Sequence, residues 1–389
     1  MNFKLTDKNT ALIVLAGSHA YGMAGPNSDI DVRGICIAPI WTHISRQQGG
    51  FDQTENPNFD HAHNAKDSLK RTIEKASGRE ILDKDWKELD ATIYDVGKAI
   101  QLMGNCNPNM LELVFTDPSD VIYKNDIGQM LIDNKEKFIS LKTRGTYLGY
   151  GHAQLKNIQR HRSWLLSPPK KQPERSEFGL PDNHSLLSVK EHNLINEEIQ
   201  KKVRSWGIDQ IDMPPQERIQ LKENMKDFWK EVLKTNEADL DFKLDDLAAN
   251  SLGLSDEVRA ALTAEKKYRT SLSYWKSYLS WKDGRNPKRK KLEEEFGYDT
   301  KHASHLIRLM RTGCEILTTG NLFVKRDDAE DLLSIRRGER TYEDIVEEAN
   351  SLESEMEVLF KKNVNNLPIR TDSKKLDDLH RDIIVKFIL

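Results

Sequence analysis

The sequence predicts an α+β protein in which strands occur early in the chain and helices dominate the remainder. Short apolar runs typical of strands lie within the first 120 residues, and helical periodicity prevails beyond about residue 130. A chain of 389 residues is too long for one small core. We therefore expect an N-terminal α/β domain over 1–125, built on a small mixed sheet, and a mostly helical domain over 126–389.

The N-terminal elements follow from local pattern. Strands are predicted at Ala11–Ala16, Asp31–Ala38 and Asp90–Tyr94, and Asp95 is a good N-cap for a helix that continues to Met103. A charged helix is expected at 67–76, an irregular insertion at 40–64, and a further helix in NMLELVF after the Asn107-Pro108 turn.

Helical periodicity then predicts a series of helices, interrupted by a Pro-rich loop at 167–181. The expected helices are 128–142, 145–165, 188–204, 215–235, 255–281, 300–318 and 341–363.

Composition narrows the class of protein. Charged residues make up 31% of the chain, and it has no apolar run of about 18 residues, so we expect no membrane span. The N-terminal apolar segment is short and ends in Gly-Ser, which favours a first strand over a signal peptide. The three cysteines are far apart and odd in number, which predicts a reducing, cytoplasmic setting rather than disulfides.

The first candidate feature is the turn Gly17-Ser18 at the end of a strand. A short helix that begins there would point free backbone N–H groups outward, and the serine hydroxyl adds a donor. Such donors suit phosphate oxygens, although Gly-Ser turns are also common in ordinary surface loops.

The second feature is Asp29-Ile30-Asp31 at the head of the next strand. Residues i and i+2 of a strand share a face, so both carboxylates converge while Ile30 points toward the core. Two close carboxylates repel each other unless a divalent cation lies between them, and Mg²⁺ prefers oxygen ligands. The alternative is an Asx-turn with solvated aspartates.

A third carboxylate completes a site for two Mg²⁺ ions and a nucleoside triphosphate (NTP). Asp90 opens the third strand and shares a face with Thr92 and Tyr94, so it is the first choice. Asp95 is second, because it falls on the opposite face and suits the helix cap.

The pattern GSHAYG…SDIDVRG resembles the DNA-polymerase-β-like nucleotidyltransferase superfamily. Within it the chain is similar to predicted nucleotidyltransferases associated with RNA ligases, a group linked to RNA repair. The resemblance implies a polymerase-β-like fold and Mg²⁺-dependent transfer of a nucleoside monophosphate from NTP, with Asp29, Asp31 and Asp90 as metal-binding catalytic residues. Further similar segments are Tyr21, Asn107–Phe115, Tyr147–Leu165, Phe178–Pro181 and Gly297–Leu309.

The late segment GYDTKHASHLIRL places Lys301, His305, Arg308 and Thr312 in one helical stripe. One interpretation is a basic face that crosses the N-terminal site and binds the triphosphate, together with Gly17, Ser18 and Tyr21. The alternative is a solvent-exposed basic face in which His305 is satisfied by a neighbour. His302 and His305 lack further ligands for a zinc site.

The acceptor is expected to be a nucleic-acid end, most of all RNA. The segment QLKNIQRHRSWLL carries Lys156, Arg160 and Arg162 beside Trp164, which suits phosphate neutralisation and base stacking. The alternative is that Trp164 belongs to the apolar face of a helix. Other functions left open are nucleotidylation of a protein or small molecule, and nucleotide or RNA binding without catalysis.

Overall fold

The computed structural model describes residues 4–25, 28–39, 51–77, 89–181, 256–285 and 287–389. The chain divides into two compact units: Met1–Leu166 with Pro287–Leu389, and Ser167–Asn286. The helices expected at 188–204 and 215–235 lie outside the described residues. Whether 1–125 by itself carries the catalytic function stays a prediction.

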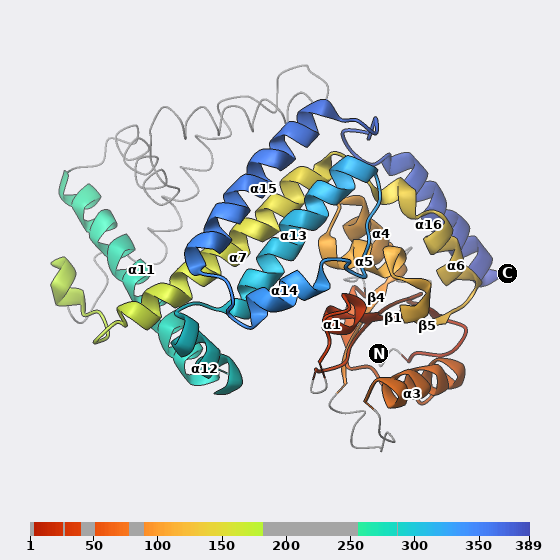
Figure 1. The fold of residues 1–389 in the computed structure, drawn as a ribbon, viewed down its shortest axis with the longest axis horizontal. Helices are drawn as coiled ribbons and strands as arrows, with labels where there is room; N and C mark the ends of the chain where they lie inside the picture. Colours follow the sequence, from red (N-terminus) through yellow and green to blue (C-terminus); the bar gives the residue numbers. More distant parts are fainter. Residues whose placement is uncertain (1–3, 26–27, 40–50, 78–88, 182–255, 286) are drawn as a thin grey trace. The chain divides into compact units, whose positions relative to one another are not determined.

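The first unit contains a mixed five-stranded sheet in the order β3-β4-β2-β1-β5. β1 pairs antiparallel with β2 and β5, β2 pairs parallel with β4, and β3 pairs antiparallel with β4. Figure 1 labels β1, β4 and β5. The strands are β1 (Thr10–Ala16), β2 (Asp31–Cys36), β3 (Gln53–Glu55), β4 (Asp90–Asp95) and β5 (Val121–Lys124).

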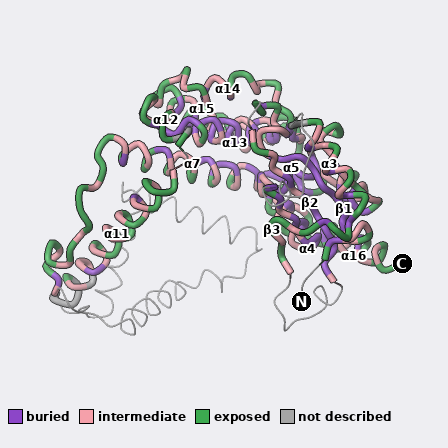
Figure 2. Tube along the Cα trace, turned by 90° about the horizontal axis from the view of Figure 1, so that it is seen from below, coloured by how far each residue is buried: buried purple, intermediate pink, exposed green. Residues whose placement is uncertain are grey.

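Both faces of the sheet are covered, because each strand alternates its side chains between two apolar layers. Ile13, Val32 and Ile93 face α3 (His63–Ser77) in one layer. Leu12, Val14 and Ile35 face the other layer. The strands β1 and β2 are drawn largely purple, the colour of buried residues, in Figure 2. The helices of that layer are α4 (Val96–Gly104), α5 (Pro108–Phe115), α6 (Asp126–Asp133) and α16 (Ser373–Ile388).

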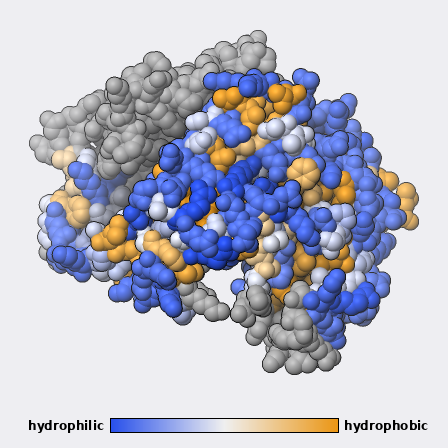
Figure 3. Space-filling view, in the orientation of Figure 1, coloured by the Kyte–Doolittle hydropathy of each residue, from blue (hydrophilic) through white to orange (hydrophobic). Residues whose placement is uncertain are grey.

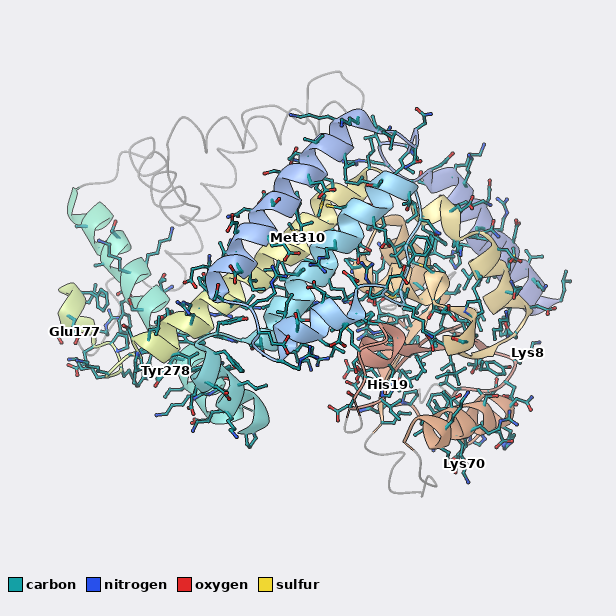
Figure 4. All side chains as sticks on the ribbon, in the orientation of Figure 1. Lys8, His19, Lys70, Glu177, Tyr278 and Met310 are labelled. Carbon is teal, nitrogen blue, oxygen red and sulfur yellow. The ribbon has the colours of Figure 1, made fainter. Side chains whose placement is uncertain are left out.

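Helices from both ends of the sequence complete this unit. α7 (Lys142–Leu166) packs against α13 (Thr300–Thr319), and a Cβ added at Gly151 would lie 2.6 Å from the sulfur of Met310. Figure 4 labels Met310, which is 1% exposed, between these helices. The other helices of this part are α12 (Pro287–Phe296), α14 (Ala329–Arg336) and α15 (Tyr342–Lys362).

The second unit contains α11 (Asp256–Gly284) and the 3-10 turn η4 (Arg175–Phe178). The guanidinium of Arg175 binds the carboxylate of Glu265, which is 2% exposed, and lies 5.2 Å from the ring centroid of Tyr268. The Pro-rich segment is therefore held on α11 by this ion pair and by ring contacts with Tyr268.

The predicted α+β class is confirmed, and the differences are local. The insertion at 40–64 contains the short strand β3, and the helix expected at 128–142 is instead α6, a 3-10 turn at Lys135–Phe138 and the start of α7. β5, α12, α14 and α16 were not predicted. None of the helices among the described residues is both long and apolar enough to span a membrane. Hydrophilic side chains cover much of the face shown in Figure 3.

Candidate active site

Asp31 occupies the first position of β2, between the ends of two neighbouring strands. In the sheet register it is opposite Ala16 on the antiparallel β1 and opposite Asp90 on the parallel β4. Side chains at paired positions of adjacent strands lie on the same face, so Asp31 and Asp90 share one face. Ile30 packs against the opposite apolar layer, as the alternation predicts.

The glycine turn lies directly against this aspartate. Gly17 has a left-handed φ of +60°, and a Cβ added to it would lie 2.0 Å from Oδ2 of Asp31. Only glycine leaves room for the carboxylate at that position. Ser18 follows in α1 (Gly17–Ala20), whose His19 is labelled in Figure 4. The turn and Asp31 therefore occupy the same place in the fold.

Electrostatics support the grouping of the acidic residues around Asp31. Burial raises the pKa of this carboxyl group, and the negative charge of Asp90 raises it further. Asp29, which is exposed two residues before the strand, adds a smaller effect in the same direction. The positive charges of Arg33 and Lys301 oppose the rise. The pKa of Asp31 is therefore influenced by two negative and two positive neighbouring side chains.

Asp95, the second choice for the third carboxylate, uses both of its carboxylate oxygens in hydrogen bonds to the backbone. It is 4% exposed, and its two oxygens accept hydrogen bonds from the backbone N–H groups of Gly97 at 2.8 Å and Ala38 at 3.0 Å. It caps α4 from the opposite face of β4. The geometry thus favours Asp90 over Asp95 as the partner of Asp31.

The three candidate carboxylates are not gathered as tightly as a single-ion site would require. Among the described residues, the group of three whose ligand atoms all lie within 4.8 Å of one another is a different one, His161, Asp299 and His302. A pair of ions spaced about 3.5–4 Å apart needs a more extended set of ligands, since each ion contacts only part of it.

A buried ionic cluster adjoins the acidic site. Glu112 on α5 accepts a hydrogen bond from Tyr21 Oη at 2.8 Å and one from Arg308 Nη1 at 2.7 Å. Arg33, which shares the face of Asp31 on β2, has its Nη1 4.0 Å from the other side of the same carboxylate. The Arg308 guanidinium stacks 3.8 Å from the ring centroid of Tyr21.

The cluster keeps its charges despite burial. Burial alone would raise the pKa of Glu112, but Arg308 and Arg33 outweigh that effect and hold the pKa below its ordinary value. The same surroundings have the opposite consequence for His305, which loses its charge. Its Nδ1 lies 3.3 Å from Arg308 Nη2. Burial and the Arg308 charge lower the pKa of His305 to about 3, so this imidazole is neutral near pH 7.

A family comparison agrees with this geometry. The family model RlaP, described as the RNA repair pathway DNA polymerase beta family, matches residues 6–165. Residues 6–165, less than half of the chain, are thus similar to the RlaP family. The resemblance predicted from the Gly-Ser and Asp-x-Asp motifs is confirmed over that range. A comparison with curated proteins and one with solved structures found no match.

The segment that matches the RlaP model ends before α13, where the predicted stripe of Lys301, Arg308 and Thr312 is only partly exposed. Lys301 is exposed, but Arg308 and Thr312 are each 3% exposed. The Arg308 guanidinium is held by Glu112 and Tyr21, and the Thr312 hydroxyl donates to the carbonyl of Arg308. Arg308 and Thr312 therefore lie on the buried side of α13, and we withdraw Arg308 as a direct phosphate ligand.

Of the residues on α7 that were predicted to bind nucleic acid, some are exposed and others contact neighbouring protein groups. Lys156 and Arg160 are exposed, and Arg160 lies 5.4 Å from the ring centroid of Trp164. Trp164 is 2% exposed and stacks with His161, which corrects its assignment as an open base-stacking surface. Arg162 donates to the carbonyl of Gly297 at 3.1 Å and stacks on Tyr342. These contacts connect α7 to Gly297, which precedes α13, and to Tyr342, the first residue of α15.

Sequence reasoning missed Arg33 and Glu112, although both leave a signal. Arg33 is two residues after Asp31, so the alternation that aligns Asp29 with Asp31 also aligns Arg33. Glu112 is the one charged residue in the apolar helix PNMLELVF, and a charge at a buried position needs an opposite partner.

Proposed function

We propose that this chain is a Mg²⁺-dependent nucleotidyltransferase that moves a nucleoside monophosphate from NTP to an acceptor hydroxyl, with release of pyrophosphate. The observation that carries the proposal is the position of Asp31, which is paired with Asp90 in the sheet and lies against the Gly17 turn. The RlaP match over residues 6–165 supports a polymerase-β-type reaction in RNA repair.

The acidic residues fit magnesium. Asp90 and Asp29 both raise the pKa of Asp31, so the cluster is strained by like charge and gains from a bound cation. Carboxylate oxygens are the hard ligands that Mg²⁺ prefers, and Asp29, Asp31 and Asp90 would hold it. When bound, the ions neutralise phosphate charge and favour the ionised form of the attacking hydroxyl.

The remaining steps fall to the chain's own residues. Ser18 and the amides of its turn would donate to the terminal phosphates, because the first N–H groups of a helical turn have no partner within it. Arg33 replaces Arg308 as the proposed arginine ligand of phosphate. Its Nη1 is shielded from solvent and has no hydrogen-bond partner among the described residues. Asp90 is exposed, so it can accept the proton of the acceptor hydroxyl.

Lys301 is the residue of α13 that we propose to contact the nucleotide. It is exposed, and its charge acts on Asp31, so it lies within electrostatic reach of the acidic residues. His305 is neutral and can donate or accept a hydrogen bond, but it adds no positive charge near pH 7.

RNA is the proposed acceptor. The family description supports it, and the exposed Lys156 and Arg160 on α7 offer phosphate contacts. The binding of single-stranded RNA should weaken with salt and with replacement of both residues by Gln.

The test incubates the full-length protein with each labelled NTP, Mg²⁺, and separate pools of RNA and protein. Label is expected in RNA, and Asp29→Ala or Asp31→Ala should abolish it. Asp60→Ala serves as a control, because this aspartate is exposed and pairs with Lys66. Label in protein would instead favour protein nucleotidylation. Full transfer by either alanine variant would refute the metal assignment, and NTP binding without any transfer would favour a non-catalytic role.

A further inference from the structure

A second cluster of metal-ligating side chains lies where α7 meets the first turn of α13. Its members are His161 on α7, Asp299 at the N-cap of α13, and His302 in the first turn. One ligand atom from each residue lies within 4.8 Å of the other two. None of these residues takes part in the proposed nucleotidyl transfer.

The donors meet at one carboxylate oxygen. Oδ2 of Asp299 lies 2.5 Å from Nδ1 of His302 and 3.7 Å from Nδ1 of His161. Oδ1 of Asp299 is already used, because it accepts the backbone N–H of His302 at 3.0 Å. The carboxylate is 2% exposed, so water does not satisfy it. A buried carboxylate needs compensating partners, and here two imidazole rings face it.

The surrounding structure fixes each of these side chains. Tyr298 is 1% exposed and donates its hydroxyl to the carbonyl of Arg340 at 2.7 Å, which anchors the residue before Asp299. Arg162 holds the carbonyl of Gly297 at 3.1 Å. The His161 ring stacks on Trp164 with a centroid separation of 5.6 Å. Such supports hold a ligand set in place and are typical of functional metal sites.

We propose that His161, Asp299 and His302 bind a divalent transition-metal ion of the zinc class. Ligands around a tetrahedral ion with bonds of about 2.0–2.1 Å lie roughly 3.3 Å apart, and the distances above bracket that value. Two imidazole nitrogens and one carboxylate oxygen suit Zn²⁺, whereas Mg²⁺ prefers oxygen alone. Water or a substrate atom would take the fourth position.

His305, the other histidine near His302 on α13, is not part of the proposed metal site. His305 Nδ1 faces the Arg308 guanidinium, a cation that repels a metal ion. The ligands that the sequence motif lacks come from α7 and from the residue that caps α13. A bound ion would join these two helices directly and fix the turn that carries Lys301.

The test uses full-length protein stripped of metal with a chelator and then titrated with Co²⁺ or Zn²⁺ in excess Mg²⁺. Excess Mg²⁺ would occupy the oxygen-rich aspartate cluster, so the titration would report on the histidine site. About one ion per chain is expected to bind, with the visible spectrum of tetrahedral Co²⁺. X-ray absorption of the Zn²⁺ form should show imidazole nitrogen at about 2.0–2.1 Å.

His161→Ala and His302→Ala should each weaken binding by more than about 100-fold, because loss of a direct ligand exceeds the loss of an outer-shell partner. His152→Ala is the matched control: this histidine is on the same helix and pairs with Glu353 at 3.1 Å. Circular dichroism of the metal-free variants checks folding, and His161→Gln replaces any alanine variant that fails. Equal affinity in wild type and folded variants, or no tight binding by wild type, would overturn the site.

Discussion

Asp31 and Asp90 are paired residues of two parallel strands, and after burial the charge of Asp90 is the largest influence that raises the pKa of Asp31. Two carboxylates in this relation destabilise each other in the metal-free protein. A bound cation converts the same proximity into a favourable arrangement. Stability, as well as activity, should therefore report on the metal.

Asp31→Asn is expected to stabilise the metal-free protein near neutral pH. The folded-state pKa of Asp31 is raised, so between the ordinary aspartate pKa and this higher value the folded chain binds more protons than the unfolded chain. Stability of the wild type thus falls as pH rises through that window. Below about pH 3.9 both states are protonated and the difference from the variant should vanish.

Thermal unfolding with and without Mg²⁺ measures this effect. Mg²⁺ should raise the melting temperature of the wild type and leave that of Asp31→Asn nearly unchanged. An equal response of both proteins to Mg²⁺ would show that Asp31 is not a ligand.

Asp90→Ala and Asp95→Ala should separate catalysis from folding. Asp90 is exposed, so its removal should alter stability by about 0.5 kcal/mol or less, while transfer falls by roughly 10²–10⁴-fold. Asp95→Ala removes a helix cap and leaves the buried N–H of Ala38 unsatisfied, at a cost of about 2 kcal/mol or more. Urea unfolding and transfer per folded molecule give both readouts. The opposite pattern would make Asp95 the third carboxylate.

Gly17→Ala should lower transfer strongly. A methyl group there would overlap Oδ2 of Asp31, and the left-handed backbone adds about 1–2 kcal/mol of strain. Gly22→Ala is the matched control: its φ is +73°, but its Cβ would meet only ordinary contacts, the nearest at 3.9 Å. Both variants carry the left-handed strain, but only Gly17→Ala also displaces Asp31, so it should lose more stability than Gly22→Ala and it alone should lose Mg²⁺-dependent transfer. Equal activity in the two would mean that the close approach to Asp31 has no catalytic consequence.

Glu112→Gln should destabilise the protein by about 3–5 kcal/mol, because it leaves the buried Arg308 without its counter-charge. Since the pKa of Glu112 is lowered in the folded state, its contribution is present above the ordinary glutamate pKa and is lost as pH falls. The loss in the variant should therefore shrink in acid. Unfolding at several pH values measures it.

A double-mutant cycle with Arg308→Met isolates the pair. The combined variant should recover much of the stability lost in Glu112→Gln, because an uncharged pair replaces an unbalanced buried charge. Additive losses would mean that the two residues act independently. Tyr21→Phe, which removes only the hydroxyl donor to Glu112, should cost about 1–2 kcal/mol.

Local pattern was sufficient for the strands that carry Asp31 and Asp90, for the Gly17 turn, and for Asp95 as a helix cap. Each depends on residues within one strand or one turn. The short edge strands β3 and β5 have only three and four residues, and they form because a neighbouring strand is there to pair with.

Arg308 shows that helical periodicity does not reveal whether a charged stripe is exposed or buried. A helical stripe containing Lys301 and Arg308 is the same whether it faces solvent or a buried carboxylate. The choice depends on Glu112, which is 196 residues away in the chain. His161 is a similar case, because it lies against Asp299 at the start of α13. Contacts between distant segments set these roles, and one sequence does not show them.

The compact unit formed by Met1–Leu166 and Pro287–Leu389 has a consequence for how the protein is made. The nascent chain emerges from the ribosome with Glu112 and the apolar side of α7 long before α13 exists to cover them. The N-terminal segment must therefore wait through the synthesis of some 120 intervening residues before its core can close. The first unit can therefore be completed only after the intervening segment has been made, and truncated chains that end before α13 should be prone to aggregation.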